Sequence, residues 1–252
     1  MRFAILGLDH WYTAFGACEV LAASTENTLV AICTENDDHA AWAAEKYPNV
    51  PLLRNPRQVF IDTEIDCVLI CAPTALAEDY ALDVMESGKH VLGVKPTSNT
   101  LDGLRMVICT SEENDVFYGS FEGIQRFHPK TLALKNILAS GTIGRVLSVH
   151  QVGNGGLPAP WEGRASGEPS WWIDPEMIHT GAWMDHAIYA IDLLRFSLNA
   201  EVDAVAGHIG NRLHNDLPME DYGMALLRLK TPSGPVSVVM EDTWSSNPGG
   251  GA

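Results

Sequence analysis

The sequence has few basic residues, few cysteines and no long apolar run, and each shortage excludes a class of protein. Its 252 residues include 16 Lys and Arg against 32 Asp and Glu, which gives a formal net charge of −16. A surface of that sign repels phosphate backbones, so we expect no nucleic-acid partner. The apolar runs are too short to span a bilayer, and the first of them is too short for a signal peptide. We therefore expect no membrane partner and a cytoplasmic location.

The cysteines are odd in number and lie in apolar segments; they are Cys18, Cys33, Cys67, Cys71 and Cys109. This pattern favours buried free thiols in a reducing compartment over a framework of disulfides. Cys67 and Cys71 are too far apart for a C-x-x-C motif, and one face of a strand would hold both side chains. We interpret that pair as core residues.

In the first half of the chain, short apolar segments alternate with helical patterns. Strands are predicted at Arg2–Leu8, Thr28–Cys33, Cys67–Ala72, His90–Val94 and Val116–Ser120, and helices at Thr13–Ala23, Asp37–Lys46, Leu76–Ser87 and Leu101–Glu113, with helix caps at Asn55 and Thr100. The strands are continuous apolar runs, which is typical of a parallel sheet covered on both faces. Repeated strand–helix–strand units predict an α/β fold, with a doubly wound Rossmann domain over residues 1–120.

Residues 121–252 follow a different pattern. Helices are predicted at His128–Ser140 and Thr180–Leu198, and strands at Val146–Val152, Val202–Ile209, Met224–Lys230 and Pro235–Trp244. This succession predicts an α+β domain with a mainly antiparallel sheet. The irregular segment 153–175 is rich in Gly, Pro and Trp, which is typical of a lid or a binding loop. The chain ends just after a strand, in a segment that contains Gly249–Gly251, which would suit either a C-terminally incomplete domain or a shortened member of its class.

The first predicted strand leads directly into the segment from Gly7 to Tyr12, where a dinucleotide loop would have the pattern G-x-G-x-x-G. Only Gly7 matches, because Asp9 and Tyr12 take the other two glycine positions. An ordinary strand-to-helix turn explains this segment equally well. If a dinucleotide binds, we expect Gly7, Asp9, His10 and Trp11 to contact it, since backbone N–H groups there can approach the pyrophosphate.

The second predicted strand ends at Thr34 and Glu35. An acidic residue in this position normally binds the adenosine ribose, so Glu35 would favour NAD. If Thr34 faces the ribose instead, NADP is equally acceptable, and Glu35 would then only cap the following turn. The sequence therefore predicts NAD or NADP as the cofactor without deciding between them.

Five segments together resemble the Gfo/Idh/MocA family of oxidoreductases over essentially the whole chain. They are Ile65–Pro73, Ser87–Pro96, Gln125–Pro129, Ser140–Val146 and Asp185–Leu194. The resemblance implies an NAD(P)-dependent dehydrogenase or reductase whose small-molecule substrate is a sugar, an inositol-like polyol or a related hydroxy compound. It also implies a homodimer or homotetramer that pairs through the open face of the C-terminal sheet. Pro73, at the end of the first segment, is assigned to the cofactor site.

Lys95 is the first predicted catalytic residue. The resemblance implies that it matches the lysine of the family's Glu-Lys-Pro motif beside the nicotinamide, although Val94 replaces the Glu. Independently, Lys95 follows the C-terminal end of an apolar strand, where open α/β sheets bind their ligands. An ammonium group there can stabilise charge that develops on a substrate oxygen. A solvated lysine at a strand end is the alternative.

Asp185 and Tyr189 are the other predicted catalytic residues. The resemblance implies an Asp followed four residues later by a His on a helix that faces the nicotinamide, and here Tyr189 replaces that His. Residues so spaced share one face of a helix, which Asp192 continues. A phenol can exchange a proton if an ammonium such as that of Lys95 stabilises the phenolate. A packed aromatic is the alternative for Tyr189. The core stripe of the helix is predicted at Met184, Ile188, Ile191 and Leu198.

The residues predicted to bind substrate are Arg126, His128, Trp172, His179 and His186. Arg126 suits a hydroxyl-rich or carboxylated ligand, although a salt bridge at a domain interface explains it equally well. Trp172, like Trp161 and Trp171, would stack on a sugar ring or pack against a second subunit. The spacing of His179, Asp185 and His186 matches no familiar metal motif, so we predict no metal.

Two other functions stay open on the sequence alone. Asp9, Tyr12, Val94 and Tyr189 differ from the residues that the dinucleotide loop and the family's motifs have at these positions. These differences would suit a nucleotide-binding regulator or a pseudoenzyme without turnover. Alternatively, the dinucleotide stays bound and is used within a catalytic cycle, as in redox-assisted glycoside cleavage. Cofactor retained through purification would favour that second alternative.

Overall fold

The computed structural model describes residues 1–158 and 170–245, which form two compact units. The first unit contains Met1–Glu122, together with Ser170, Trp171 and Glu176–Ile178 from further along the chain. The second unit contains the other described residues from Gly123 onward. The two units therefore meet along the chain at Glu122, close to the boundary predicted at residue 120.

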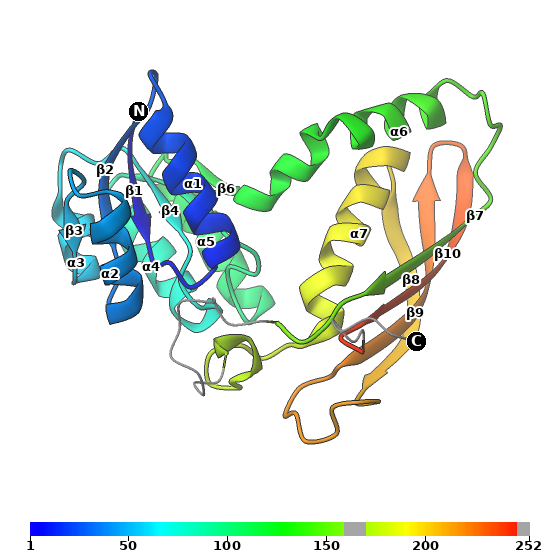
Figure 1. The fold of residues 1–252 in the computed structure, drawn as a ribbon. Helices are drawn as coiled ribbons and strands as arrows, with labels where there is room; N and C mark the ends of the chain where they lie inside the picture. The colour runs from blue at the N-terminus through cyan, green and yellow to red at the C-terminus, as the bar shows by residue number, and fades with distance from the viewer. Residues whose placement is uncertain (159–169, 246–252) are drawn as a thin grey trace. The chain divides into compact units, whose positions relative to one another are not determined.

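The first unit is a parallel sheet whose strands alternate with helices along the chain (Figure 1). Its elements are β1 (Arg2–Leu6), α1 (Trp11–Ala23), β2 (Thr28–Cys33), α2 (Asp37–Lys46), β3 (Leu52–Leu53), α3 (Pro56–Ile61), β4 (Cys67–Ile70), α4 (Thr74–Glu86), β5 (His90–Gly93), α5 (Leu101–Glu113) and β6 (Tyr118–Ser120). The strand order is β3-β2-β1-β4-β5-β6. The order reverses between β1 and β4, and open sheets bind their ligands beyond the carboxyl ends of the strands at such a point.

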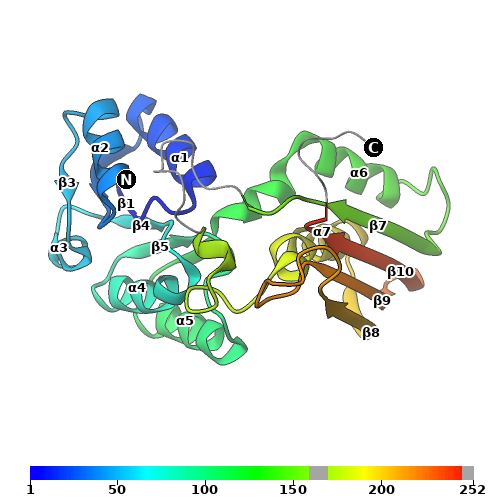
Figure 2. The ribbon, with the colours of Figure 1, turned by 60° about the horizontal axis from the view of Figure 1, so that its bottom comes forward.

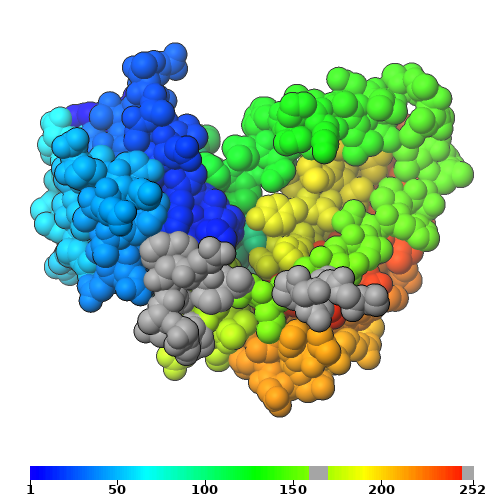
Figure 3. Space-filling view, in the orientation of Figure 1, coloured from blue at the N-terminus to red at the C-terminus, as the bar shows by residue number. Residues whose placement is uncertain are grey.

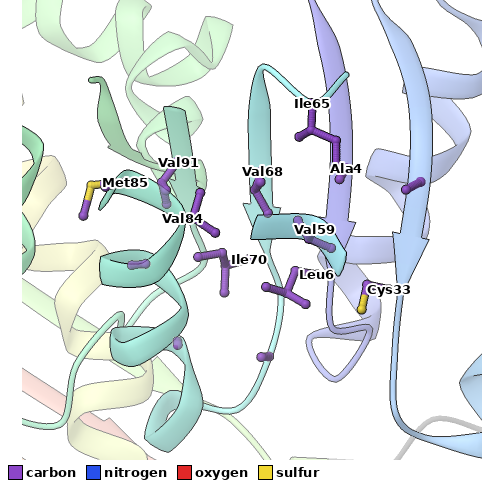
Figure 4. Packing of buried hydrophobic residues seen from close by; sticks show 14 of the residues in the cluster. Ala4, Leu6, Cys33, Val59, Ile65, Val68, Ile70, Val84, Met85 and Val91 are labelled. Carbon is purple, nitrogen blue, oxygen red and sulfur yellow. The ribbon is translucent and has the colours of Figure 1, made fainter. Parts of the chain in front are cut away.

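Both faces of this sheet are covered, because successive side chains of each strand point to opposite faces. Ala4 and Leu6 pack in a core with residues of α3, α4 and α5, and Figure 4 shows Val59 and Val84 of those helices in this cluster. Ile5 points the other way and packs with residues of α1 and α2. The predicted doubly wound parallel sheet is thereby confirmed.

Three features of the first unit differ from the predictions. Cys109 is exposed, because α5 buries Gly103 and Val107 and the cysteine lies on the opposite side of the helix. Leu76, which the apolar pattern of its helix predicts to be buried, is 37% exposed at the first turn of α4, where Ala77 is buried instead. Strand β3 was not predicted, since two residues are too few to show a period. The other four cysteines are buried and free, as predicted.

The second unit pairs helices with a four-stranded sheet (Figure 2). Its elements are α6 (Pro129–Ala139), β7 (Ser148–Asn154), α7 (Ala182–Leu198), β8 (Glu201–Gly210), β9 (Tyr222–Thr231) and β10 (Gly234–Thr243). Two short 3-10 helices, η1 (Phe121–Phe127) and η2 (Trp171–Ile173), include residues of both units. The strand order is β7-β10-β9-β8, in which only the β7–β10 pair is parallel. The predicted α+β fold with a mainly antiparallel sheet is confirmed.

Helix α7 covers one face of this sheet and forms the core of the second unit with it. Ala187 is buried, and Trp183, Ile191 and Leu194 pack around it against residues of β9 and β10. The predicted core stripe is therefore wrong at Met184, which is 38% exposed. The helix has apolar side chains on two adjacent stripes, and the sequence could not decide which one faces the sheet. Figure 3 shows the side chains of α6 (green) against those of α7 (yellow).

The helices can be compared with the length and composition that a transmembrane helix needs. Within residues 1–158 and 170–245, none of them has both the length and the apolar composition that a bilayer crossing needs.

Candidate functional site

The chain turns from β1 toward α1 at Gly7, a position that requires glycine. Its φ is +79°, in a region that other residues rarely adopt. A Cβ atom there would lie 2.6 Å from the backbone nitrogen of Ala72, just beyond β4. The backbone N–H of Gly7 also donates to the carbonyl oxygen of Cys33 at the end of β2, at 2.8 Å. Gly7 therefore brings the carboxyl ends of three strands together.

Replacing Gly7 by Ala is expected to lower the free energy of unfolding by about 1 to 3 kcal/mol, because a strained φ and a backbone overlap both oppose it. The same change should weaken NADH binding, since it moves the turn that the sequence predicts to contact the nucleotide. Urea denaturation and fluorescence titration with NADH measure the two effects. Gly16→Ala is the matched control, because nothing lies within 4 Å of a Cβ atom at Gly16. Equal stability of the two variants would contradict this account of the turn.

His10 lies at the N-terminus of α1 and is buried. Its backbone N–H donates to the carbonyl oxygen of Cys71 at 3.0 Å, and its Nδ1 lies 3.1 Å from the hydroxyl of Tyr12. The ring of Trp171 packs against it with centroids 4.8 Å apart. Burial, and to a smaller extent the charge of Lys95, lowers the pKa of His10 to about 3. The imidazole is therefore neutral at physiological pH, which identifies it as a wall of the loop and not as a charged ligand for phosphate.

A pocket of about 130 Å³ opens at the carboxyl ends of β1, β2 and β4. It brings together five of the predicted cofactor residues: Gly7, Asp9, Thr34, Glu35 and Pro73. Leu76, Tyr80 and Met177 also line it, and none of them was predicted. Because β1 and β4 are the strands between which the order reverses, the pocket lies where this fold binds its ligands.

Thr34 and Glu35 both line this pocket but differ in exposure and in hydrogen-bond partners. Thr34 is 3% exposed, and its Oγ1 accepts a hydrogen bond from the backbone N–H of Asn36 at 3.3 Å. Glu35 is exposed, and its carbonyl oxygen accepts from Arg54 Nη2 at 2.7 Å. The carboxylate of Glu35 is therefore the better placed of the two groups to meet a ribose.

Lys95 follows β5 and lies deep in the first unit, with 7% of its surface exposed. Its backbone N–H donates to Oε2 of Glu122 at 3.0 Å, and Ser120 Oγ donates to the same oxygen at 3.4 Å. The other oxygen, Oε1, is buried and has no hydrogen-bond partner among the described residues. Burial raises the pKa of Glu122, while the hydrogen bond from Lys95 and its charge oppose that shift. Glu122 thus supports Lys95, and sequence reasoning missed it.

These residues fit a dinucleotide at two points. The turn at Gly7 leads into the N-terminus of α1, whose first backbone N–H groups can bind a phosphate. The pocket places Glu35 where an adenosine ribose would bind. Asp9 fits least, because its carboxylate lines the same pocket and would repel a pyrophosphate.

Asp185 and Tyr189 lie on α7 in the second unit and are both half-buried. The indole Nε1 of Trp244 donates to Oδ2 of Asp185 at 3.3 Å. The same oxygen lies 3.3 Å from Nε2 of His186. The carboxylate is thus held in place within its own unit. Lys95 belongs to the first unit, so a joint action of Lys95 and Tyr189 stays a prediction.

Arg126 and His128, two of the predicted substrate residues, have structural partners in the second unit. Arg126 forms a two-pronged ion pair with Asp192, whose carboxylate raises the pKa of the guanidinium above its ordinary value. The guanidinium carbon also lies 5.4 Å from the centre of the Phe196 ring. The side chain of His128 accepts a hydrogen bond from the backbone N–H of Lys130 at 3.2 Å, which caps α6. Asp192 lies on the same continuous helix as Asp185 and Tyr189, at a spacing that puts the three on one side of α7, and its carboxylate is paired with Arg126.

The remaining predicted residues lie in different surroundings. Trp172 is buried, at 6% exposure, and His179 is exposed. Trp161 lies outside the described residues. Among residues 1–158 and 170–245, no group of three or more His, Cys, Asp or Glu side chains is arranged to hold a metal ion.

Two family models match the chain, one in each half. Residues 1–120 match the model described as an oxidoreductase family with an NAD-binding Rossmann fold. Residues 131–250 match the model described as the GFO/IDH/MocA C-terminal domain.

Curated relatives of the chain include several dehydrogenases. It is 27% identical to inositol 2-dehydrogenase 2 of Saccharopolyspora erythraea, over 82% of this chain and 55% of the relative. It is 24% identical to myo-inositol 2-dehydrogenase of Thermotoga maritima, over 95% of this chain and 67% of the relative. It is 29% identical to scyllo-inositol 2-dehydrogenase (NAD(+)) of Bacillus subtilis, over 93% of this chain and 65% of the relative. The chain thus spans between 55% and 67% of the lengths of these relatives.

Solved structures share the fold at low sequence identity. GenD2 from gentamicin A biosynthesis, in complex with NAD, superposes with a TM-score of 0.83 at 20% identity, over 100% of this chain and 67% of that one. An oxidoreductase from Agrobacterium radiobacter, in complex with NAD+, L-tartaric acid and magnesium, gives a TM-score of 0.82 at 17% identity, over 99% and 68%.

Proposed function

Because the chain belongs to the GFO/IDH/MocA oxidoreductase family, we propose that it is an NAD(P)-dependent dehydrogenase or reductase of a CH–OH group. The substrate class is a sugar, an inositol-like polyol or a related hydroxy compound, which the names of its relatives support. The observation that carries the proposal is the pocket that gathers Gly7, Glu35 and Pro73 at the carboxyl ends of the strands.

The proposed mechanism divides the work among three side chains. When bound, the nicotinamide exchanges a hydride with the substrate carbon. Lys95 donates a hydrogen bond to the oxygen on that carbon and stabilises the charge that develops there. Tyr189 gives or takes the hydroxyl proton, because a phenol is a competent acid and base when an ammonium stabilises its anion. Asp185, one turn earlier on α7, orients the substrate or the phenol.

Titration with NADH and with NADPH, followed by fluorescence or calorimetry, is the first test, because every catalytic step presupposes a bound nicotinamide. A panel of inositols and sugars, read by absorbance of the reduced nicotinamide, is the second. Binding with no turnover across the panel would favour a regulator or pseudoenzyme, the function that the departures at Asp9, Val94 and Tyr189 suggest. Absence of binding would overturn the proposal.

NADH is expected to bind more tightly than NADPH, because the 2′-phosphate of NADPH would meet the carboxylate of Glu35. Two charges about 4 Å apart repel by about 1 to 4 kcal/mol at a solvated or partly solvated site, which corresponds to roughly 5-fold to 900-fold in Kd. Glu35→Gln keeps the size of the side chain and removes its charge, so the ratio of the two Kd values should fall toward 1.

Glu45→Gln is the control for this change, because Glu45 is exposed at the other end of α2 and does not line the pocket. It should leave the ratio of the two Kd values as in the parent protein. If Glu35→Gln also leaves it unchanged, the ribose is recognised elsewhere, and Thr34 would be the next residue to replace.

Trp172 and His179 remain our proposals for the substrate side of the site. Arg126 and His128 are engaged in the ion pair and the helix cap described above, so we assign them to the stability of the second unit. We therefore expect loss of Arg126 to affect unfolding more than substrate affinity.

We further propose that two copies pair through the sheet face opposite α7. Leu226 of β9 and Val152 of β7 are 55% and 59% exposed. Side chains alternate along a strand, so Leu226 points away from the face that holds the buried Leu227. Light scattering tests the proposal: a dimer or tetramer supports it, Leu226→Glu should shift the mass toward one chain, and a monomeric parent protein would contradict it.

A further inference from the structure

The imidazole of His186 lies between two carboxylates in the second unit. Its Nε2 is 3.3 Å from Oδ2 of Asp185, the neighbouring residue on α7. Its Nδ1 is 3.2 Å from Oδ1 of Asp242, which lies on β10. The carboxylate of Asp242 is deeply buried, with 2% of its side chain exposed, whereas the ring is 37% exposed. A histidine thus joins the predicted catalytic aspartate to a buried acid that sequence reasoning did not single out.

Two glycines make room for this arrangement. A Cβ atom at Gly155 would lie 2.4 Å from Cε1 of His186, and one at Gly153 would lie 2.5 Å from Oδ2 of Asp242. Gly153 belongs to β7, the strand paired with β10, and faces Asp242 in register. The missing side chains therefore leave the space that the ring and the buried carboxylate occupy.

The chemistry of the ring decides its protonation. A neutral imidazole has one N–H donor and one bare nitrogen, so it can donate to only one of the two carboxylates. The bare nitrogen would then face an oxygen of the other carboxylate, two acceptors in contact. A doubly protonated ring has an N–H on each side, which removes that repulsion. Its charge also offsets the cost of a buried charge on Asp242, whose Oδ1 also accepts from the backbone N–H of Thr243 at 3.1 Å.

We propose that His186 carries both ring protons and acts as a positioning residue that links Asp242 to Asp185 and fixes the Asp185 carboxylate. The indole of Trp244 donates to Oδ2 of Asp185, and the charge of the ring attracts the same oxygen from 3.3 Å. Among the residues that the structure describes, the charged groups that face the ring are Asp185 from its own helix and Asp242 from β10, while Gly153 and Gly155 present no side chain. The catalytic part of this inference rests on the proposed dehydrogenase function, but the protonation of the ring does not.

The protonation is tested by ¹⁵N–¹H NMR of the histidine rings in the whole protein at neutral pH. Protons on both nitrogens of His186 are the expected result, and a neutral tautomer would overturn the proposal. Asp242→Asn keeps an acceptor oxygen but removes the charge, so the His186 ring should lose one proton. Assignment uses His186→Asn, with His150→Asn as the control because His150 is exposed on β7.

The positioning role is tested by kinetics with NAD+ and myo-inositol, or another polyol from the panel that is turned over. Asp242→Asn and Gly155→Ala should each lower kcat by about 10- to 100-fold, because each displaces the group that holds Asp185. The Kd for NADH should stay unchanged, and the ring signature should change in both variants. Normal kcat in variants with an altered ring would overturn the positioning role. A doubly protonated ring in a protein without turnover would instead mean that the proposed function has failed.

Discussion

Lys95→Ala is expected to lower kcat for a polyol substrate by about 100- to 1000-fold and to leave the Kd for NADH nearly unchanged. The expected loss in kcat is that of removing one preorganised hydrogen-bond donor to a developing negative charge. The lysine follows β5 in the same sheet whose β1, β2 and β4 ends form the pocket proposed for the nucleotide. In the proposed mechanism it acts at the reacting oxygen and not at the adenosine end of the cofactor. Stopped-flow measurement of nicotinamide reduction, with separate NADH titration, distinguishes the two effects.

Lys89→Ala is the matched control, because Lys89 is a second largely buried lysine of the first unit. Its Nζ donates to the carbonyl oxygen of Phe60 at 2.7 Å and to Ser87 Oγ at 3.2 Å, so its partners are structural. This variant should lower Tm while the folded protein keeps its kcat. The two lysines should therefore separate activity from stability, and equal kcat in Lys95→Ala and the parent protein would reject the assignment of Lys95.

The hydrogen bond that Lys95 makes with Glu122 shows why part of the site could not be predicted from the sequence. The residue before it is the apolar Val94, so no carboxylate lies next to it along the chain. A carboxylate reaches its backbone N–H from Glu122 instead, 27 positions later. Trp171 reaches the loop after β1 from 162 positions away, where its indole donates to the carbonyl oxygen of Asp9. Contacts of that range depend on the finished fold and leave no periodic pattern.

The parts of the site that could be predicted all follow from local rules. Gly7 was identified from its place after an apolar strand, and its positive φ explains the choice of residue. Thr34 and Glu35 were identified from their place at the end of a parallel strand, Pro73 was assigned with the family resemblance, and the pocket gathers all three. The parallel sheet therefore allowed Thr34 and Glu35 to be predicted even though the glycine pattern of the loop after the first strand is incomplete.

The fold was also predicted from local patterns, most reliably where a pattern has clear start and stop signals. Strand β2 and helices α2 and α5 begin and end at the predicted residues, and the caps Asn55 and Thr100 both accept hydrogen bonds from their helices. The errors fall where a pattern is ambiguous or too short. The two apolar stripes of α7 and the two residues of β3 carry no signal that a sequence pattern can resolve.

Tyr189→Phe is expected to lower kcat by about 100- to 10,000-fold, the range for loss of a general acid or base. The change removes one hydroxyl and keeps the ring that packs on α7, so folding should be little affected. Tyr222→Phe is the control: its hydroxyl lies on β9 of the same unit, where it contacts the sulfur of Met224 at 3.6 Å. That variant should keep the kcat of the parent protein.

Tyr189→His separates a proton carrier from a packed aromatic. An imidazole has an ordinary pKa of about 6.5 and a phenol of about 10, so the base form of the variant is reached at lower pH. Oxidation of the polyol should therefore survive in Tyr189→His, with the rise of kcat displaced toward lower pH. If Lys95 assists the phenol, Lys95→Ala and Tyr189→Phe should cost much less together than the product of their separate effects, because the two residues act as a unit. Independent, multiplying effects would show that each side chain serves a different step, and unchanged kcat in Tyr189→Phe would remove the phenol from the mechanism.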